Sequence, residues 1–141
     1  MIEKYVVSLD LAKKLKEAGW EKVTTFQWGI DTTTSDVTLI KINRLYPGEA
    51  RIHKRIKYPA PLAEEILEEL PKYIHEYVEC EGKTYYLTAE INEIGYRVGY
   101  RTEPICLCDQ IEWLYLSAPY DKLSDAAART WLWLKEDGYL E

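Results

Sequence analysis

Apolar residues recur at helical spacing near both ends of the chain. Near the start, Leu11, Ala12 and Leu15 share one face of a segment that begins at Val7 and stops at Gly19. The segment 121–139 has the same character, and its apolar face is formed by Leu123, Ala126, Ala127, Thr130, Trp131 and Leu134. Its opposite face carries Asp125, Arg129, Lys135 and Glu136. The pattern predicts an amphipathic helix at each end.

Alternation of apolar and polar residues predicts two β-hairpins between these helices, one from residues 24–30 and 37–42 and one from residues 84–91 and 96–101. The segment Ile111–Ser117 is apolar at nearly every position, which predicts a central strand covered on both faces. We therefore expect an α+β fold in a single domain spanning residues 1–141. Its core is expected to be one mostly antiparallel, twisted sheet of about five strands, packed against the N- and C-terminal helices.

The middle of the chain has a weaker pattern. Residues 51–57 predict an edge strand or an extended arm, and Pro61 suits the first turn of a helix that runs to Leu70. That helix would bury its leucines and place four glutamates on its other face: Glu64, Glu65, Glu68 and Glu69. The segment 72–82 fits no single conformation.

Composition narrows the classes of protein. A chain of 141 residues with 47% hydrophobic content has an ordinary single-domain size. The net charge of −6 disfavours a general affinity for nucleic acid or for an anionic membrane. The sequence shows no apolar run of membrane-spanning length and no signal-peptide pattern, so we expect a cytoplasmic protein without membrane contact.

Metal binding and catalysis have weak sequence support. Cys106 and Cys108 resemble half of a zinc site, but the second cysteine pair that such sites usually contain is missing. We therefore expect reduced, unligated cysteines, no metal and no cofactor. The four glutamates predict a solvated helix face rather than an acid/base pair, and no Ser/His/Asp arrangement or phosphate-binding loop occurs. A small hydrolase or metal-dependent enzyme is accordingly the least favoured function.

Charge is distributed unevenly along the chain. Residues 41–58 hold six Lys and Arg against one Glu, about +5, which leaves about −11 for the remainder. The basic-patch candidates are Arg51, Lys54, Arg55 and Lys57. They would either pair with the glutamates of the 61–70 helix or meet an acidic partner, including nucleic acid. A nucleic-acid-binding accessory factor that uses the basic segment 51–57 is thus the alternative function.

The second hairpin is rich in tyrosine. Tyr85, Tyr96 and Tyr100 would either stack bases, with Arg97 and Arg101 near the phosphates, or pack across strands beneath a helix. The spacing of residues departs from that of RNA-recognition strands, which favours packing.

Several stretches together resemble a group of small uncharacterised proteins encoded by bacteriophages and integrated prophages. They are Tyr-Pro-Ala-Pro at 58–61, the Leu-Ala-Glu-Glu run that ends at Pro71, the tyrosine-rich hairpin and the terminal Ala-Ala-Ala-Arg-Thr-Trp-Leu-Trp-Leu helix. The resemblance is a general pattern over the last two thirds of the chain. It implies an accessory role in a bacterial or phage setting, and it implies no activity.

One residue breaks the pattern of the terminal helix. Leu132 falls in the middle of its polar face, between two tryptophans, Trp131 and Trp133. If Leu132 and one tryptophan are exposed, they form an apolar patch rimmed by charge, as protein contacts do. We therefore expect a non-catalytic accessory protein that associates with a partner protein or with its own copy through these residues.

Overall fold

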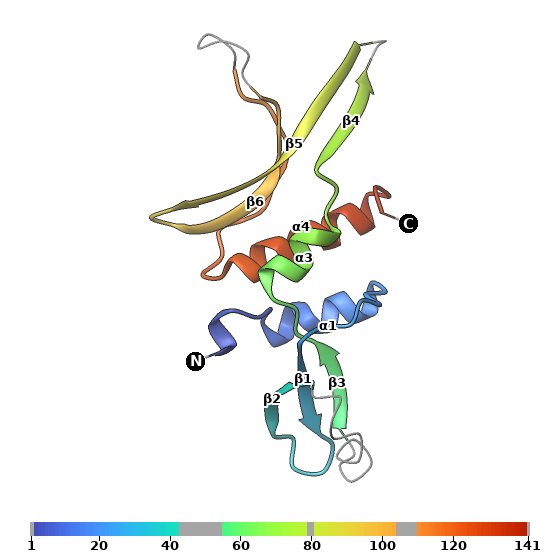
Figure 1. Cartoon of the computed structure of the whole chain (residues 1–141), viewed down its shortest axis with the longest axis vertical. Helices are drawn as coiled ribbons and strands as arrows, with labels where there is room; N and C mark the ends of the chain where they lie inside the picture. The colour runs from blue at the N-terminus through green and yellow to red at the C-terminus, as the bar shows by residue number, and fades with distance from the viewer. Residues whose placement is uncertain (1, 43–54, 79–80, 104–109, 141) are drawn as a thin grey trace.

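The computed structural model describes residues 2–42, 55–78, 81–103 and 110–140 (Figure 1). It is an α+β structure with two antiparallel sheets, ordered β2-β1-β3 and β4-β5-β6-β7. In chain order the elements are the 3-10 helix η1 (Ile2–Lys4), α1 (Leu9–Glu17), β1 (Phe26–Asp31), β2 (Val37–Lys41), β3 (Arg55–Pro59), α3 (Ala63–Glu69), β4 (Tyr73–Val78), β5 (Glu81–Asn92), β6 (Gly95–Arg101), β7 (Trp113–Leu116) and α4 (Leu123–Glu136). The α+β class and both hairpins are confirmed, whereas the expectation of a single sheet is wrong.

Two strand pairings divide the β structure. The basic segment supplies β3, which pairs with β1 and not with the second hairpin. The segment 72–82, for which the pattern favoured no conformation, supplies β4, which pairs with β5. Figure 1 shows the helices between the two sheets, with α4 and α3 nearer the four-stranded sheet and α1 nearer the three-stranded one. The N-terminal helix therefore packs on β3 and α4, rather than on the sheet that α4 covers.

The end of α1 follows the predicted glycine stop. Gly19 has a φ of +96°, which is the left-handed region that favours glycine, and the Trp20 N–H donates to the Leu15 carbonyl at 2.9 Å. The Trp20 ring then folds back and meets Trp131 edge to face, with 5.2 Å between centroids. This contact fixes α1 against α4.

The tyrosine-rich hairpin lies under α4. Asn92 Oδ1 accepts from the N–H groups of Ile94 and Gly95 and so closes the turn between β5 and β6. Val98 and Tyr100 are fully buried, and the Thr130 hydroxyl of α4 donates to the Val98 carbonyl at 3.1 Å. The packing interpretation of these tyrosines is confirmed, because their face of the sheet is covered by α4.

The apolar sequence of β7 predicted a central strand, and this prediction is wrong. β7 is the edge strand next to β6, and all four of its residues are half-buried. The two strands come so close at Gly99 that a Cβ there would collide with the Tyr115 carbonyl oxygen. Glycine at this position is therefore a packing requirement.

Candidate functional site

The interface candidates of the terminal helix lie inside the domain. Leu132 is only 3% exposed and Trp131 is buried against Trp20. Trp133 is half-buried and stacks on Tyr115, with centroids 4.3 Å apart and rings 14° from parallel. The expectation of an exposed patch at Leu132 is therefore wrong for the single chain.

The reason is that α4 occupies a middle layer and is buried on two sides. Thr130 and Trp133 meet the four-stranded sheet. On another side of the helix, Asp125 Oδ1 accepts from the Ser8 N–H at the start of α1, at 2.7 Å. Asp125 and Leu132 lie seven residues apart, hence on the same stripe of the helix. The stripe of Asp125 and Leu132 is thus buried, with the Asp125 carboxylate capping α1, whereas Arg129 and Glu136 on the same polar face stay partly or largely exposed.

The predicted pairing of the charge blocks is not found at Lys57. In the part of the chain that the structure describes, Lys57 makes no ion pair with a glutamate of α3. Glu69 pairs instead with Lys22 at 3.0 Å, and Glu65 accepts from the Thr25 N–H at 3.1 Å. Arg51 and Lys54 lie outside the described residues, and only the backbone of Arg55, in β3, is described.

The described residues contain neither a metal-binding cluster nor a membrane-spanning helix. Cys106 and Cys108 lie outside the described residues, and the described residues hold no group of three His, Cys, Asp or Glu able to bind a metal. Among the described helices, none has the length and apolar composition needed to cross a membrane.

A different surface emerges on the four-stranded sheet. We call the side turned away from α4 the outer face. Four paired residues form a row across it, one from each strand: Tyr73 pairs with Tyr86, Tyr86 with Arg101, and Arg101 with Trp113, where the register of β6 and β7 shifts. Because neighbouring strands lie about 4.8 Å apart, this aromatic row spans about 15 Å.

The members of the aromatic row are open to solvent to different degrees. Tyr73 is 55% and Tyr86 38% exposed, while Arg101 and Trp113 are half-buried. The Arg101 guanidinium lies over the Trp113 ring, 5.7 Å from its centroid, a cation–π arrangement. The contact orients these two side chains of the row relative to each other.

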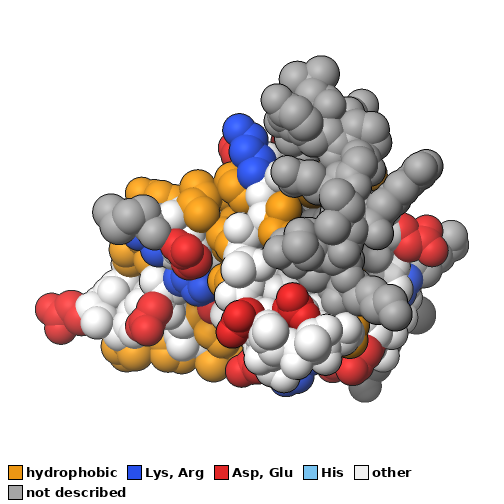
Figure 2. Space-filling model, turned by 90° about the horizontal axis from the view of Figure 1, so that it is seen from below, with side chains coloured by type: hydrophobic (Ala, Val, Ile, Leu, Met, Phe, Trp, Pro, Cys, Tyr) orange, Lys and Arg blue, Asp and Glu red, His pale blue; other side chains and the backbone are white. Residues whose placement is uncertain are grey.

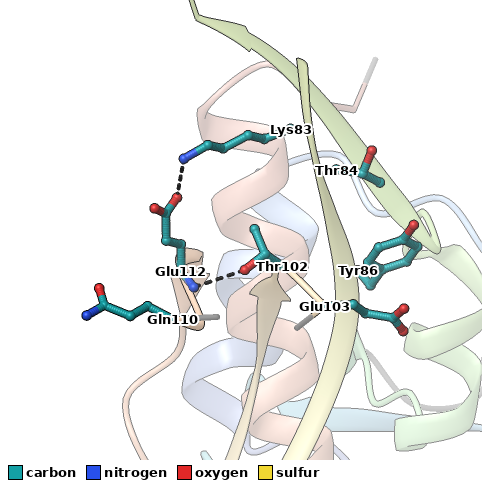
Figure 3. A pocket seen from close by; sticks show the side chains of 7 residues that line it. All are labelled: Lys83, Thr84, Tyr86, Thr102, Glu103, Gln110 and Glu112. Carbon is teal, nitrogen blue, oxygen red and sulfur yellow. Dashed lines mark hydrogen bonds and ion pairs between the residues drawn. The ribbon is translucent and has the colours of Figure 1, made fainter. Parts of the chain in front are cut away.

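A polar pocket of about 470 Å³ adjoins the aromatic row at Tyr86 (Figure 3). Lys83 donates to Glu112 at 2.6 Å, and the hydrogen bond raises the pKa of the Lys83 ammonium. Figure 3 shows Thr102 bonded to the Glu112 backbone and Glu103 close by. Two carboxylates against one ammonium make this rim acidic.

Further polar pairs lie on the outer face, outside the aromatic row. The Thr84 hydroxyl and His75 Nδ1 are 2.7 Å apart, and His75 also meets Tyr73 edge to face. Arg97 stands opposite Glu90 across β5 and β6, and its Nε is buried without a hydrogen-bond partner. The outer face thus mixes aromatic rings with charges of both signs.

Sequence reasoning singled out the covered face of this sheet and missed the outer one. Tyr73, His75 and Tyr77 alternate as a strand does, and that alternation is the signal that would have identified β4.

Comparisons with protein-family models, with curated proteins and with solved structures found no match.

Proposed function

We propose that the protein is a non-catalytic accessory protein that binds another protein through the outer face of its four-stranded sheet. The observation that carries this proposal is the aromatic row of Tyr73, Tyr86, Arg101 and Trp113. Tyr, Trp and Arg are the residues that contribute most of the energy of protein interfaces. Rings held on a sheet lose little conformational entropy on binding, which favours a contact of this kind.

Charge distinguishes a protein partner from a nucleic acid at this surface. Aromatic rings on a sheet also stack bases, but single-strand binders combine such rings with a positively charged groove. Here the adjoining pocket carries Glu103 and Glu112 against Lys83, and the whole chain has a net charge of −6. With Arg101 of the row included, two cations face two carboxylates, so this surface lacks the positively charged groove that single-strand binders use.

The experiment is site-specific photo-crosslinking in the cells of origin, with benzoylphenylalanine in place of Tyr86. The expected result is a covalent adduct with a protein, which is absent when the probe replaces Lys14, an exposed residue of α1. Arg101→Glu should weaken the adduct about tenfold, since an interface arginine commonly contributes more than about 1 kcal/mol. Lys14→Glu changes the charge equally and should leave the adduct intact. Adducts with nucleic acid alone, or equal adducts from both positions, would overturn the proposal.

A second candidate rests on the basic segment 51–57. Lys57 makes no ion pair with the described glutamates of α3, which favours an acidic partner over internal pairing. Figure 2 shows the molecule from the end that carries the three-stranded sheet. On this end acidic and basic side chains are interspersed, and apolar side chains gather toward the left of the view. If nucleic acid binds through this segment, its affinity for labelled DNA or RNA falls steeply with salt.

A further inference from the structure

The edge strand β4 has a row of backbone groups that no described strand engages. The Leu87 N–H donates to the Lys72 carbonyl at 2.9 Å, so Lys72 and Leu87 form a hydrogen-bonded pair. In an antiparallel ladder such pairs alternate with pairs that turn their N–H and C=O groups outward. The outward residues are therefore Tyr73, His75 and Tyr77, and β4 is the last strand of its sheet.

The outward positions of this edge lack the protection that edge strands normally have. Charged side chains, prolines and bulges usually block edge-to-edge pairing. The other edge strands of the two described sheets have such devices. On β3, Pro59 has no N–H and the Lys57 carbonyl accepts from Lys16 at 3.0 Å. β7 has only four residues and an irregular register at Arg101, and β2 ends in Lys41.

The outward residues of β4 carry no such device. Their side chains lie on the outer face, and two of them are strongly exposed: Tyr73 by 55% and Tyr77 by 78%. All three are residues that suit a strand or pair across one, and none is lysine, arginine or proline.

The sequence of the edge is complementary to itself. In an antiparallel pair of β4 strands centred on His75, Tyr73 of each copy lies opposite Tyr77 of the other. The three outward positions then form three pairs, each of which exchanges two backbone hydrogen bonds. Both tyrosine pairs are aromatic cross-strand pairs on one face, which stabilise antiparallel sheets.

Neighbouring registers are worse. Centring on Glu76 would set the two Glu76 carboxylates opposite each other, and like charges directly opposite destabilise a pair. Centring on Ile74 would bring Pro71, which lacks an N–H, opposite Tyr77. The His75-centred register is therefore specified by the residues themselves.

We propose that two copies of the chain associate through antiparallel pairing of their β4 strands, centred on His75, and form one continuous eight-stranded sheet. The contact is isologous, as in twofold dimers, and it closes both edges at once. It also extends each aromatic row by one ring, since Tyr73 of one copy then meets Tyr77 of the other. This inference goes beyond the proposed function, because the dimer forms along the edge of the sheet and the partner binds on its face.

The test is a pair of charge variants studied by sedimentation of the full chain over a concentration series. Tyr73→Lys combined with Tyr77→Lys places two like-charged pairs across the interface. Tyr73→Glu combined with Tyr77→Lys places two opposite-charged pairs there. We expect the wild type to dimerise, the lysine pair to weaken the dimer on the order of tenfold or more, and the Glu/Lys pair to bind more tightly than the Lys/Lys pair.

Hydrogen exchange locates the contact independently. In dilute protein the amides of Tyr73, His75 and Tyr77 should exchange freely, and in concentrated protein they should be protected. A wild type that stays monomeric, a dimer without this protection, or equal dissociation constants for the two variants would overturn the inference. Crosslinking from Tyr86 to a partner protein is read separately, so either proposal can fail while the other stands.

Discussion

Replacing Leu132 by alanine distinguishes the buried position that this residue has in the structure from the solvated position that the sequence pattern predicts. If Leu132 lay on a solvated helix face, its truncation would change stability by less than about 0.5 kcal/mol. In the structure, Leu132 is 3% exposed and belongs to the hydrophobic core. The two arrangements therefore predict effects that differ several-fold.

The magnitude follows from burial. Truncating a fully buried leucine to alanine removes its transfer free energy and leaves a cavity, which together cost about 2–5 kcal/mol. The middle layer is confined between α1 and the four-stranded sheet, so little collapse around the cavity is expected, and we place the loss at about 3 kcal/mol. For a chain of this length each kcal/mol lowers the thermal midpoint by about 3 °C, which gives a shift of about 9 °C.

The assay is thermal and urea unfolding followed by circular dichroism, with Ile94→Ala as the matched control. Ile94 is 65% exposed at the β5–β6 turn, and its truncation should shift the midpoint by about 1–2 °C at most. The Leu132→Ala shift should be the same at low and high protein concentration, because the contact lies within one chain. A shift no larger than that of the control, or one that appears only at high concentration, would refute the placement of Leu132 in the core.

Two further predictions concern contacts that join distant parts of the chain. Asp125→Ala removes the carboxylate that accepts from the Ser8 N–H, and should lower the free energy of unfolding by about 1–2 kcal/mol, whereas Asp121→Ala, at an exposed site, should be nearly neutral in the same unfolding assay. Burial and the hydrogen bond to Glu76 raise the pKa of Tyr139 to about 12, so the folded state holds this proton above the ordinary tyrosine pKa of about 10. The protonated Tyr139 hydroxyl therefore contributes its full stabilisation of the folded state below a pH of about 10, and this contribution is lost as the pH rises toward about 12. Ultraviolet titration should show a tyrosine that ionises near 12 and is missing in Tyr139→Phe, and an unchanged titration would contradict the assignment.

The local elements were largely determined by the sequence. The glycine stop after α1, both hairpins and the turn closed by Asn92 depend on neighbours along the chain, and spacing and turn chemistry report such neighbours directly. Apolar periodicity also identified the terminal helix to within a few residues.

The surfaces were decided only by the tertiary structure. Periodicity marks which residues share a face, but it does not say what covers that face or whether a second layer covers the opposite one. Leu132 and Asp125 look solvated in sequence, and both are buried because α4 is packed from two sides. Likewise, tyrosines alternate on both faces of the second sheet, and only the position of α4 makes one face core and leaves Tyr73 and Tyr86 exposed. The division into two sheets has the same cause, since which strand pairs with β1 or β5 is fixed by long-range contacts that a local pattern does not contain.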